Sequence, residues 1–513
     1  MCNDDDDVLS INNWAFNLNT RYNIIFRPNR YNIRVQHHAL GILDADKLAY
    51  IFPTKDVNNP KPIEDTSLEI INKQICTNPE QLQAVKRIVA GPNRYAPYIV
   101  VGPPGTGKTT TIVEAILQLY IRQPTCRILI TAGSNSACDT VALKICEYFE
   151  NHSKLIELSR ERNGQKGLYG KFKKPKNILR VFAKSCSDRD DLLKKYANFI
   201  RREIVTPSVE VLQKYNIIVV TLCTMGRLRS GIIGDWPFTH IFIDEAGAIT
   251  EPETLVAITS ANTKNCRVIM SGDTKQLGPV IMSQVAAEFG LKHSLMERLV
   301  KRECYAVKED GTYDTTLQTR LRRNYRSHPE ILRLFNHLYY KDELIAEVKK
   351  DGLLRWNEFD MLKNKGFPII FEAVRGQLGK SKSSQSSYNQ AEVDKVICVT
   401  KKLLEHVDFK KIGIISPYKL QCTKIRGELR KCNLEDIDVG TVELFQGREK
   451  PIIIVSFVKS NCNLGFVTDP QRLNVILSRA QSLLIMIGNP ETLQSNDDFK
   501  YLIEECKRMQ TFG

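Results

Sequence analysis

The stretch Tyr98-Ile-Val-Val-Gly-Pro-Pro-Gly-Thr-Gly-Lys-Thr109 decides how this 513-residue chain builds its main site. Its first four residues predict a buried strand, and the apolar positions after Thr109 recur at helical spacing. A glycine-rich turn between a strand and a helix directs backbone N–H groups and the positive end of the helix dipole at phosphate. The stretch therefore predicts a P-loop for a nucleoside triphosphate within an α/β sheet.

The positions of this P-loop differ in their expected chemistry. We expect the Lys108 ammonium to reach the β- and γ-phosphates and the Thr109 hydroxyl to ligate Mg²⁺. These roles predict hydrolysis as well as binding. The residues expected to contact the nucleotide are Gly102, Pro103, Pro104, Gly105, Thr106, Gly107, Lys108, Thr109 and Thr110.

Composition narrows the class of protein. With 73 Lys and Arg against 58 Asp and Glu, the net charge is +15, which favours polyanionic partners. Residues 151–203 hold 15 basic and 6 acidic residues, interleaved with Tyr169, Phe172 and Tyr196. This interleaving favours nucleic acid over a solvated basic surface, although the run Lys171–Lys176 also fits a nuclear-localisation signal. The absence of a long apolar run argues against a membrane span, and 14 Cys without a C-x-x-C pair favour reduced thiols in the cytosol or nucleus.

Two α/β segments follow one another along the chain. Residues 1–75 show β-like alternation, as in Tyr31–Val35, and include a Pro/Asn-rich linker at Val57–Pro62. Residues 76–300 are predicted to form one α/β domain, interrupted by a helical insertion at about 150–208. The strands expected there are Tyr98–Val101, Arg127–Thr131, Ile217–Thr221, His240–Ile243 and Arg267–Ser271.

Residues 301–513 are predicted to form a second α/β domain without a P-loop. A flexible polar loop is expected at Gly376–Ser387, followed by a helix whose start, Asn389–Glu392, has capping-box spacing. The chain should thus contain two similar sheets and one phosphate site. The expected strands of the second sheet are Pro368–Phe371, Ile412–Ile415, Ile437–Val442, Ile452–Phe457 and Leu483–Ile487.

Acidic and amide side chains follow two strands of the first domain. Asp244 and Glu245 come directly after His240–Ile243, at the strand end where ligands bind in open α/β sheets. Asp244 is expected to hold Mg²⁺ and Glu245 to polarise the attacking water. Gln276, in the polar segment after the next strand, could sense the γ-phosphate.

The order of these segments resembles a known family. Residues 102–109, 244–247, 272–279, 321–329, 439–449 and 472–481 are similar to the successive motifs of up-frameshift-like superfamily 1 helicases. Three segments resemble the Armitage and Moloney-leukaemia-virus-ten branch most closely: Tyr22–Arg30, Asn78–Val85 and Phe238–Gly247. The resemblance covers nearly the whole chain. It implies two tandem RecA-like domains, with residues 1–75 forming the end of an accessory β-barrel and stalk.

The resemblance also implies roles for single residues around ATP. Gln81 matches a glutamine that reads adenine, and Tyr325 a tyrosine that stacks on the base. Arg326 and Arg479 match two arginines of the second domain that reach the γ-phosphate, which would supply transition-state charge only when the domains close. Glu449 matches a position that contacts the nucleotide and links the domains.

A further set of residues matches family positions that contact the nucleic-acid strand. Small hydroxyls and backbone amides suit contacts to phosphate that do not depend on sequence. Each of these residues, taken singly, could equally serve as a turn or strand-end residue. They are Ser134, Asn135, Thr221, Pro417, Tyr418 and Thr441.

Three positions depart from the family pattern. Ala248 stands where glutamine or histidine is usual, Gly133 replaces a proline, and Gln481 replaces a common basic residue. These departures leave hydrolysis intact but bring efficient coupling to unwinding into question. Residues 1–60 resemble only the end of the accessory domains, so a core fragment of a longer protein is an open alternative.

Three hypotheses follow for the function. The first is an ATP-dependent RNA helicase or translocase that steps 5′ to 3′ on single-stranded RNA. The second is an ATP-gated RNA clamp or ribonucleoprotein scaffold, and the third is a DNA helicase of the same superfamily. The branch further implies small-RNA silencing, including the piRNA class, or messenger RNA control, with granule proteins as partners in the cytoplasm. We expect a monomer without a membrane span.

Overall fold

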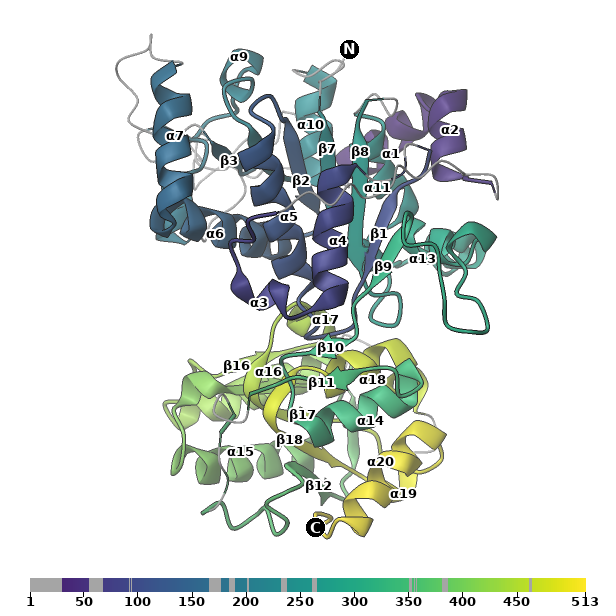
Figure 1. The fold of residues 1–513 in the computed structure, drawn as a ribbon. Helices are drawn as coiled ribbons and strands as arrows, with labels where there is room; N and C mark the ends of the chain where they lie inside the picture. The colour runs from purple at the N-terminus through teal and green to yellow at the C-terminus, as the bar shows by residue number, and fades with distance from the viewer. Residues whose placement is uncertain are drawn as a thin grey trace, which may run out of the picture.

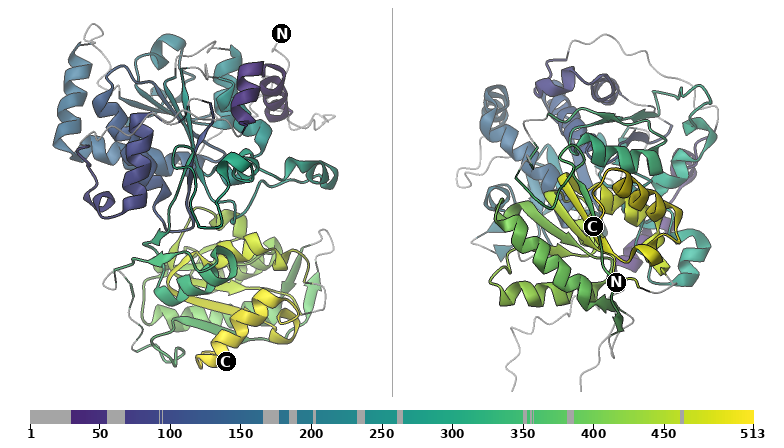
Figure 2. Two further views of the ribbon diagram at one scale, coloured as in Figure 1. Left: turned by 45° about the vertical axis from the view of Figure 1, so that its right-hand side comes forward. Right: turned by 90° about the horizontal axis from the view of Figure 1, so that it is seen from below.

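The computed structural model describes residues 30–54, 68–91, 93, 95–165, 177–183, 190–200, 203–231, 238–260, 265–349, 353, 354, 356, 358–380, 386–460 and 464–513. Within these residues two sheets, each covered by helices, lie one above the other along the molecule (Figures 1 and 2). The predicted linker Val57–Pro62, the basic run Lys171–Lys176 with Tyr169 and Phe172, and most of Tyr22–Arg30 lie outside the described residues.

The first sheet has seven parallel strands in the order β3-β6-β2-β7-β8-β1-β9. The five predicted strands are confirmed, with ends shifted by at most one residue. Strand β1 carries the P-loop, and it lies between β8 and β9. The strands are β1 (Tyr98–Val101), β2 (Ile128–Ala132), β3 (Ile178–Val181), β6 (Ile217–Thr221), β7 (His240–Ile243), β8 (Arg267–Gly272) and β9 (Gln318–Arg320).

Helices cover both faces of this sheet because the strands are apolar on both sides. Buried side chains of α4 (Pro79–Ala90), α5 (Lys108–Arg122) and α6 (Asn135–Asn151) share one core. The opposite core contains residues of α10 (Leu222–Gly231), α11 (Glu251–Ile258) and α13 (Leu295–Val300). Helix α4 begins at Asn78, whose side chain accepts the backbone N–H of Gln81, with Pro79 at the first helical position.

Two expectations for residues 1–300 are wrong. The β-like segment Tyr31–Val35 begins a helix, α1 (Tyr31–Gly41), which packs on α10 and α11. Its apolar positions Tyr31, Val35 and Ala39 follow helical i, i+4 spacing, which the alternation of shorter windows obscured. The insertion at 150–208 is not purely helical: β3 joins the main sheet beside β6, and a hairpin of β4 (Phe199–Ile200) and β5 (Glu203–Ile204) follows.

The second sheet has five parallel strands in the order β12-β18-β17-β15-β16. The predicted strands are again found, but the segment Ile437–Val442 forms only the short β16 before α17 (Val442–Phe445) begins. The polar loop Gly376–Ser387 includes one strand of a hairpin and the start of the other, β13 (Leu378–Lys380) and β14 (Ser387–Asn389). The sheet strands are β12 (Ile369–Ala373), β15 (Ile412–Ile415), β16 (Asp438–Gly440), β17 (Lys450–Ser456) and β18 (Ala480–Gly488).

Helices again cover both faces of the second sheet. The core on one face contains residues of α14 (Pro329–Tyr340), α18 (Pro470–Leu477) and α20 (Asp497–Arg508). The core on the other face contains residues of α15 (Gln390–Leu404) and α16 (Lys419–Lys431). No helix in the described part of the chain combines the length and the apolar content that crossing a bilayer requires.

The chain passes from the first domain to the second after Arg320. Strand β9 pairs with β1, so residues up to Arg320 belong to the first sheet, beyond the expected boundary at 300. Strand pairing across a long connection, rather than local pattern, determines this boundary. Arg323 and Asn324 then form β10, which pairs with the short β11 (Ile345–Ala346).

Candidate active site

The P-loop adopts a conformation that only glycine accommodates at two positions. Gly105 and Gly107 have φ of 72° and 82°, in the left-handed region that residues with a Cβ disfavour. A Cβ at Gly102 would lie 2.4 Å from Cγ of Lys108. The loop thus brings its backbone against the start of α5, as phosphate binding by N–H groups requires.

The functional groups of the P-loop lie beside the carboxylate after β7. The Lys108 Nζ donates to the carbonyl oxygen of Gly102 at 2.6 Å. The Thr109 hydroxyl donates to Asp244 Oδ2 at 3.5 Å, and Ser271 donates to Asp244 Oδ1 at 2.6 Å. The predicted juxtaposition of Thr109 and Asp244 is therefore present. Thr110 instead accepts a bond from Lys144 of α6 at 3.4 Å.

The carboxylates of Asp244 and Glu245 form an electrostatically demanding pair. Burial raises the pKa of Asp244, and the negative charge of Glu245 adds to the shift, while Ser271 and Lys108 oppose it. Glu245 has φ of 52°, a left-handed conformation that is strained for a residue with a side chain. A divalent cation fits here because it would neutralise a carboxylate that the fold otherwise buries.

Gln81 and Tyr325 both contact the P-loop, Gln81 through its side-chain amide and Tyr325 through its backbone N–H. The Gln81 amide donates to the carbonyl oxygen of Thr106 at 3.1 Å, and the side chain is buried. Tyr325 leaves 41% of its surface exposed, and its hydroxyl accepts the Asn78 amide at 2.9 Å. An exposed ring is available for stacking, whereas the Gln81 amide nitrogen is held by the P-loop.

The segment that begins the second domain is bound to the P-loop. The Asn324 amide donates to the carbonyl oxygen of Pro104 at 2.7 Å. The backbone N–H of Tyr325 donates to the carbonyl oxygen of Gly105 at 2.9 Å. Asn324 also accepts the backbone N–H groups of Arg326 and Ser327. Asn324 therefore fixes Arg326 beside the phosphate-binding loop. Asn324 lies inside the motif at residues 321–329, but the sequence alone did not predict this role for it.

Arg326 is held by groups of the second domain. Its guanidinium forms an ion pair with Glu449 and donates to the carbonyl oxygen of Ser478 at 3.4 Å. The Gln481 amide donates to the other oxygen of Glu449 at 3.2 Å. Gln481, which replaces a basic residue of the family, thus adds a neutral partner to Glu449.

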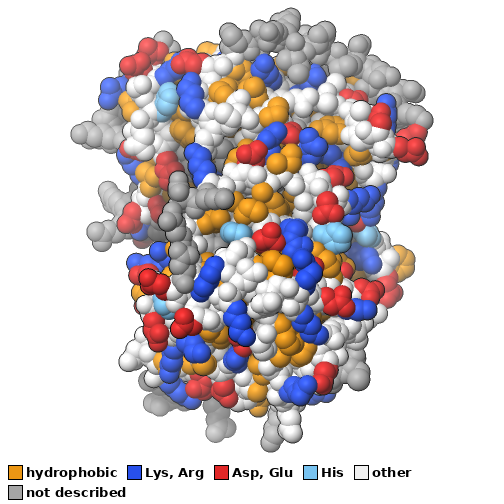
Figure 3. Space-filling model, turned by 60° about the horizontal axis from the view of Figure 1, so that its bottom comes forward, with side chains coloured by type: hydrophobic (Ala, Val, Ile, Leu, Met, Phe, Trp, Pro, Cys, Tyr) orange, Lys and Arg blue, Asp and Glu red, His pale blue; other side chains and the backbone are white. Residues whose placement is uncertain are grey.

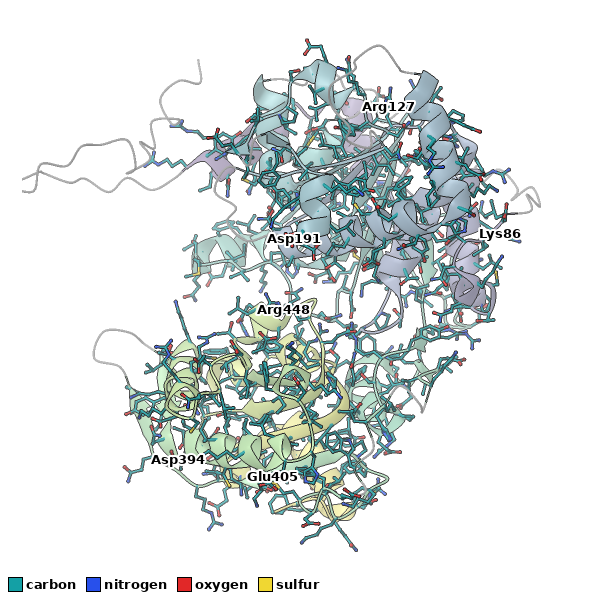
Figure 4. All side chains as sticks on the ribbon, turned by 90° about the vertical axis from the view of Figure 1, so that its left-hand side faces the viewer. Lys86, Arg127, Asp191, Asp394, Glu405 and Arg448 are labelled. Carbon is teal, nitrogen blue, oxygen red and sulfur yellow. The ribbon has the colours of Figure 1, made fainter. Side chains whose placement is uncertain are left out.

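Arg479 makes a direct contact with the first domain. It is 2% exposed, and its Nη2 donates to Gln276 Oε1 at 2.8 Å across the two domains. Burial lowers the pKa of Arg479 to about 10, and the charge of Arg326 adds to that shift. Its Nη1 donates to the carbonyl oxygen of Arg448, which Figure 4 shows on the side of the second domain that faces the first. Gln276 and Arg479, 203 residues apart, are therefore brought together as the motif order predicts.

A buried polar network that the sequence did not reveal extends this contact. Asp273 Oδ2 accepts bonds from the Gln276 amide at 3.0 Å and from the Tyr340 hydroxyl at 2.6 Å. Asn474 of α18 donates to the Tyr340 oxygen at 2.7 Å and to the carbonyl oxygen of Lys275 at 2.8 Å. Both domains contribute to this network, which fixes the loop that carries Gln276.

The residues of the first domain that were predicted to contact the nucleic-acid strand lie at the carboxyl end of the β-sheet. Ser134 caps α6 and is exposed. Asn135 is exposed too, and its side-chain oxygen accepts Nη2 of the buried Arg180 at 2.9 Å, which leaves its amide free to donate. Thr221 is mostly buried, and its hydroxyl bonds to that of Thr224. Ser134 and Asn135 are thus accessible, whereas the Thr221 side chain is occupied locally.

The residues of the second domain that were predicted to contact the nucleic-acid strand also follow the ends of β-strands. Pro417 and Tyr418 come after β15, and Thr441 comes after β16 and precedes α17. Tyr418 is only 5% exposed because the ring of Phe466 covers it, with centroids 4.8 Å apart. Of the two aromatic rings, Phe466 is the accessible one.

The two remaining departures lie near the carboxylates. Ala248 ends a 3-10 turn that begins directly after Glu245. A Cβ at Gly133 would lie 3.2 Å from Cγ1 of Ile249, so the glycine eases the packing of the strand end against this turn.

Comparison with known sequences now adds to this geometry. A sequence family described as an AAA domain matches residues 291–491, and a second family of the same description matches 76–190 and 162–284. The two matches together cover most of both α/β domains, and they meet between residues 284 and 291, ahead of the passage between the sheets after Arg320.

Individual relatives point to the same assignment. The protein mov-10-B.1 of Danio rerio, assigned as a helicase, is 36% identical over 95% of this chain and 49% of its own length. The protein armi of Drosophila melanogaster, assigned as an RNA helicase, is 30% identical over 96% of this chain and 44% of its own. An uncharacterized ATP-dependent helicase of Methanocaldococcus jannaschii is 31% identical over 91% and 75%.

Two tandem RecA-like domains, a P-loop and paired arginines thus define the class, and the chain belongs to the up-frameshift-like superfamily 1 helicases. Within that family its sequence is similar to the MOV-10 and Armitage helicases, the branch that the sequence motifs resemble. The chain spans about half the length of the first of these relatives.

Proposed function

We propose that this chain is an ATP-driven RNA helicase or translocase. The observation that carries the proposal is the bond from Arg479 of the second domain to Gln276 of the first, beside the P-loop. An arginine placed there by the second domain makes hydrolysis depend on how the two domains meet, and such a residue contributes about 10³–10⁵ in rate.

We assign a residue to each step of hydrolysis. The P-loop backbone and Lys108 would bind the triphosphate, and Glu245 would orient the attacking water. Arg326 and Arg479 would stabilise the charge that develops on the transferred phosphoryl group. Thr109 and Asp244 would hold Mg²⁺, which neutralises phosphate oxygens when bound.

RNA is the proposed polymer on the strength of the relatives and the basic charge. Figure 3 shows Lys and Arg side chains over both domains on one face, intermixed with acidic ones, so the charge is not confined to a single patch. Contacts to phosphate do not distinguish RNA from DNA, whereas contacts to the 2′-OH do. We further propose movement from 5′ to 3′, a monomeric motor, and a role in small-RNA silencing or messenger RNA control in cytoplasmic granules.

The Glu245→Gln variant tests the proposal. We expect it to bind an ATP analogue with wild-type affinity but to lose RNA-stimulated turnover by at least about 10²-fold, because the amide cannot act as a base. Undiminished RNA-stimulated ATPase in this variant contradicts the assignment of Glu245.

Three comparisons decide between the hypotheses. Displacement of a 5′-tailed but not a 3′-tailed duplex supports the directional helicase, whereas ATP turnover without displacement supports an RNA clamp. Stronger stimulation by DNA than by RNA of matched sequence supports a DNA helicase. Imaging the tagged chain with granule markers tests the cellular role.

A further inference from the structure

An aromatic ring stands exposed in the second domain, packed against Tyr418, one of the residues predicted to contact the nucleic acid. Phe466, in the 3-10 turn η7 (Gly465–Thr468), leaves 43% of its surface accessible. Tyr418 packs beneath it with the ring planes inclined by 45°, and the Arg472 guanidinium lies 5.1 Å from the Phe466 centroid. Tyr418 and Arg472 therefore support the Phe466 ring, and Phe466 carries the accessible aromatic surface.

Positive charge also lies over the Tyr418 ring that supports Phe466. The Lys459 Nζ is 5.7 Å from the Tyr418 centroid. Burial lowers the pKa of Lys459, and repulsion by the Lys380 ammonium adds to the shift. Within the described parts of the chain, neither lysine has a carboxylate within ion-pair distance. A bound phosphate would relieve this repulsion.

The backbone that carries Lys459 is held in a fixed, strained conformation. Val458 has φ of 72°, unusual for a β-branched residue. Its N–H donates to the buried carboxylate of Glu392 at 2.8 Å, and the Asn389 amide donates to Ser460 Oγ at 3.1 Å. Such strain persists only where surrounding bonds enforce it, and it is common at functional sites.

We propose that Phe466, Lys459 and Lys380 form a binding position for one nucleotide of a single strand. The exposed ring contacts the base, and the two ammonium groups contact a neighbouring phosphate. An exposed aromatic ring beside unpaired cations is the combination that single-strand binding uses. This inference rests on the proposed function and assigns one base and one phosphate of its polymer to named side chains.

The Phe466→Ala variant tests the base contact. We expect it to weaken binding of a short oligouridylate by about 5- to 100-fold, the range for removal of a stacking ring. Binding of an oligonucleotide of equal length with abasic sugars should change little. Phe466→Tyr should restore binding, and Tyr95→Ala, which removes a 61%-exposed ring ahead of β1, serves as the matched control.

The Lys459→Gln variant tests the phosphate contact separately. It should weaken the base-containing and the abasic strand alike and reduce the salt slope of binding by about 0.7, whereas Phe466→Ala should leave that slope unchanged. Thermal unfolding of each variant confirms that the domain remains folded.

The outcomes are distinct. If Phe466→Ala loses affinity equally for the base-containing and the abasic strand, or loses none, the base contact is overturned. The proposed function still stands in that case, provided that RNA stimulates the ATPase of the wild type. An unchanged salt slope in Lys459→Gln overturns the phosphate contact. If the wild type neither binds RNA nor responds to it, the proposed function itself fails.

Discussion

At the scale of single residues, Tyr340 holds a position that no local pattern marks. Its hydroxyl joins Asp273 of the first domain to Asn474 of the second, so one oxygen belongs to the contact between the domains. Burial and the charge of Asp273 raise the pKa of Tyr340 well above its ordinary value, which keeps the hydroxyl available as a donor. Tyr340 therefore acts as a positioning residue for Gln276 and, through it, for Arg479.

Removing this hydroxyl should slow turnover. We expect Tyr340→Phe to lower kcat of the RNA-stimulated ATPase by about 5- to 100-fold, the range for unsatisfied buried polar groups, with a smaller change in KM. Steady-state kinetics over a range of ATP measures both parameters. Tyr339→Phe is the matched control, because the neighbouring tyrosine donates instead to Asp498. Equal losses in both variants would indicate a purely structural effect.

The sequence predicted those site residues that stand in contiguous motifs. Lys108, Asp244, Glu245 and Arg479 belong to short segments whose residue order specifies the chemistry. Tyr340 lies 67 residues from Asp273 and 134 from Asn474, so its role exists only in the folded chain. The burial of Tyr418 likewise depends on packing with a distant ring, which no window of sequence contains.

At the scale of elements, helix α15 combines a cap with a buried acid. Asn389 accepts the backbone N–H of Glu392, as the capping-box spacing predicted. The Glu392 carboxyl does not accept the backbone N–H of Asn389, which donates to Gln421, but it accepts the Asn389 side-chain amide at 3.3 Å. It is fully buried and also accepts bonds from Ser456 Oγ and the Val458 N–H. The same residue therefore starts a helix and fixes the segment that follows β17.

This acid should make the stability of the second domain depend on pH. Burial raises the pKa of Glu392 to about 8, above its ordinary value near 4.5. A raised pKa favours the protonated acid in the fold, so its stabilising contribution is complete below pH 4.5 and is lost as pH rises through about 8. We expect Glu392→Gln to remove this loss. Denaturant unfolding at several pH values between 5 and 8 measures it, and parallel curves for the two proteins would contradict the shift.

Element assignments failed where tertiary contacts outweighed local pattern. The segment Tyr31–Val35 alternates like a strand, yet it is helical because α1 packs against α10 and α11. Strand β3 lies within a stretch dominated by basic residues, and only pairing with β6 identifies it. By contrast, β6, β7 and β15 were predicted to the residue, because continuous apolar runs bounded by polar residues mark strands buried on both faces.

At the scale of the whole molecule, the two domains meet directly at the P-loop. Gly105 lies against the start of the second domain: a Cβ there would lie 2.6 Å from Cβ of Arg326 and 2.7 Å from Nδ2 of Asn324. The tandem arrangement was predictable from two strand–helix series, but the boundary was not, because β9 returns to pair with β1.

A side chain at Gly105 should push the segment that carries Asn324 and Arg326 away from the P-loop. We expect Gly105→Ala to lose most nucleotide affinity and turnover, through both the clash and a left-handed φ of 72°. Gly91→Ala is the control, because Gly91 also has a positive φ but no atom within 4 Å of the added Cβ. Titration with a fluorescent ATP analogue and thermal unfolding separate the two effects. Similar nucleotide affinity in Gly105→Ala and Gly91→Ala would contradict the prediction, because the clash of the added Cβ with Arg326 and Asn324 would then have no effect on binding.

Helix α18 begins beside Phe466 and ends at Leu477, shortly before Arg479, so about 12 Å of one rigid element lies between the proposed base contact and the arginine. A helix this short cannot shift at one end without shifting at the other. If the strand at its start favours one placement of Arg479, thermodynamic reciprocity requires that the nucleotide favour the matching placement of the strand by the same factor. The affinity for ATP measured with saturating RNA, and the affinity for RNA measured with saturating ATP analogue, should therefore change by equal ratios.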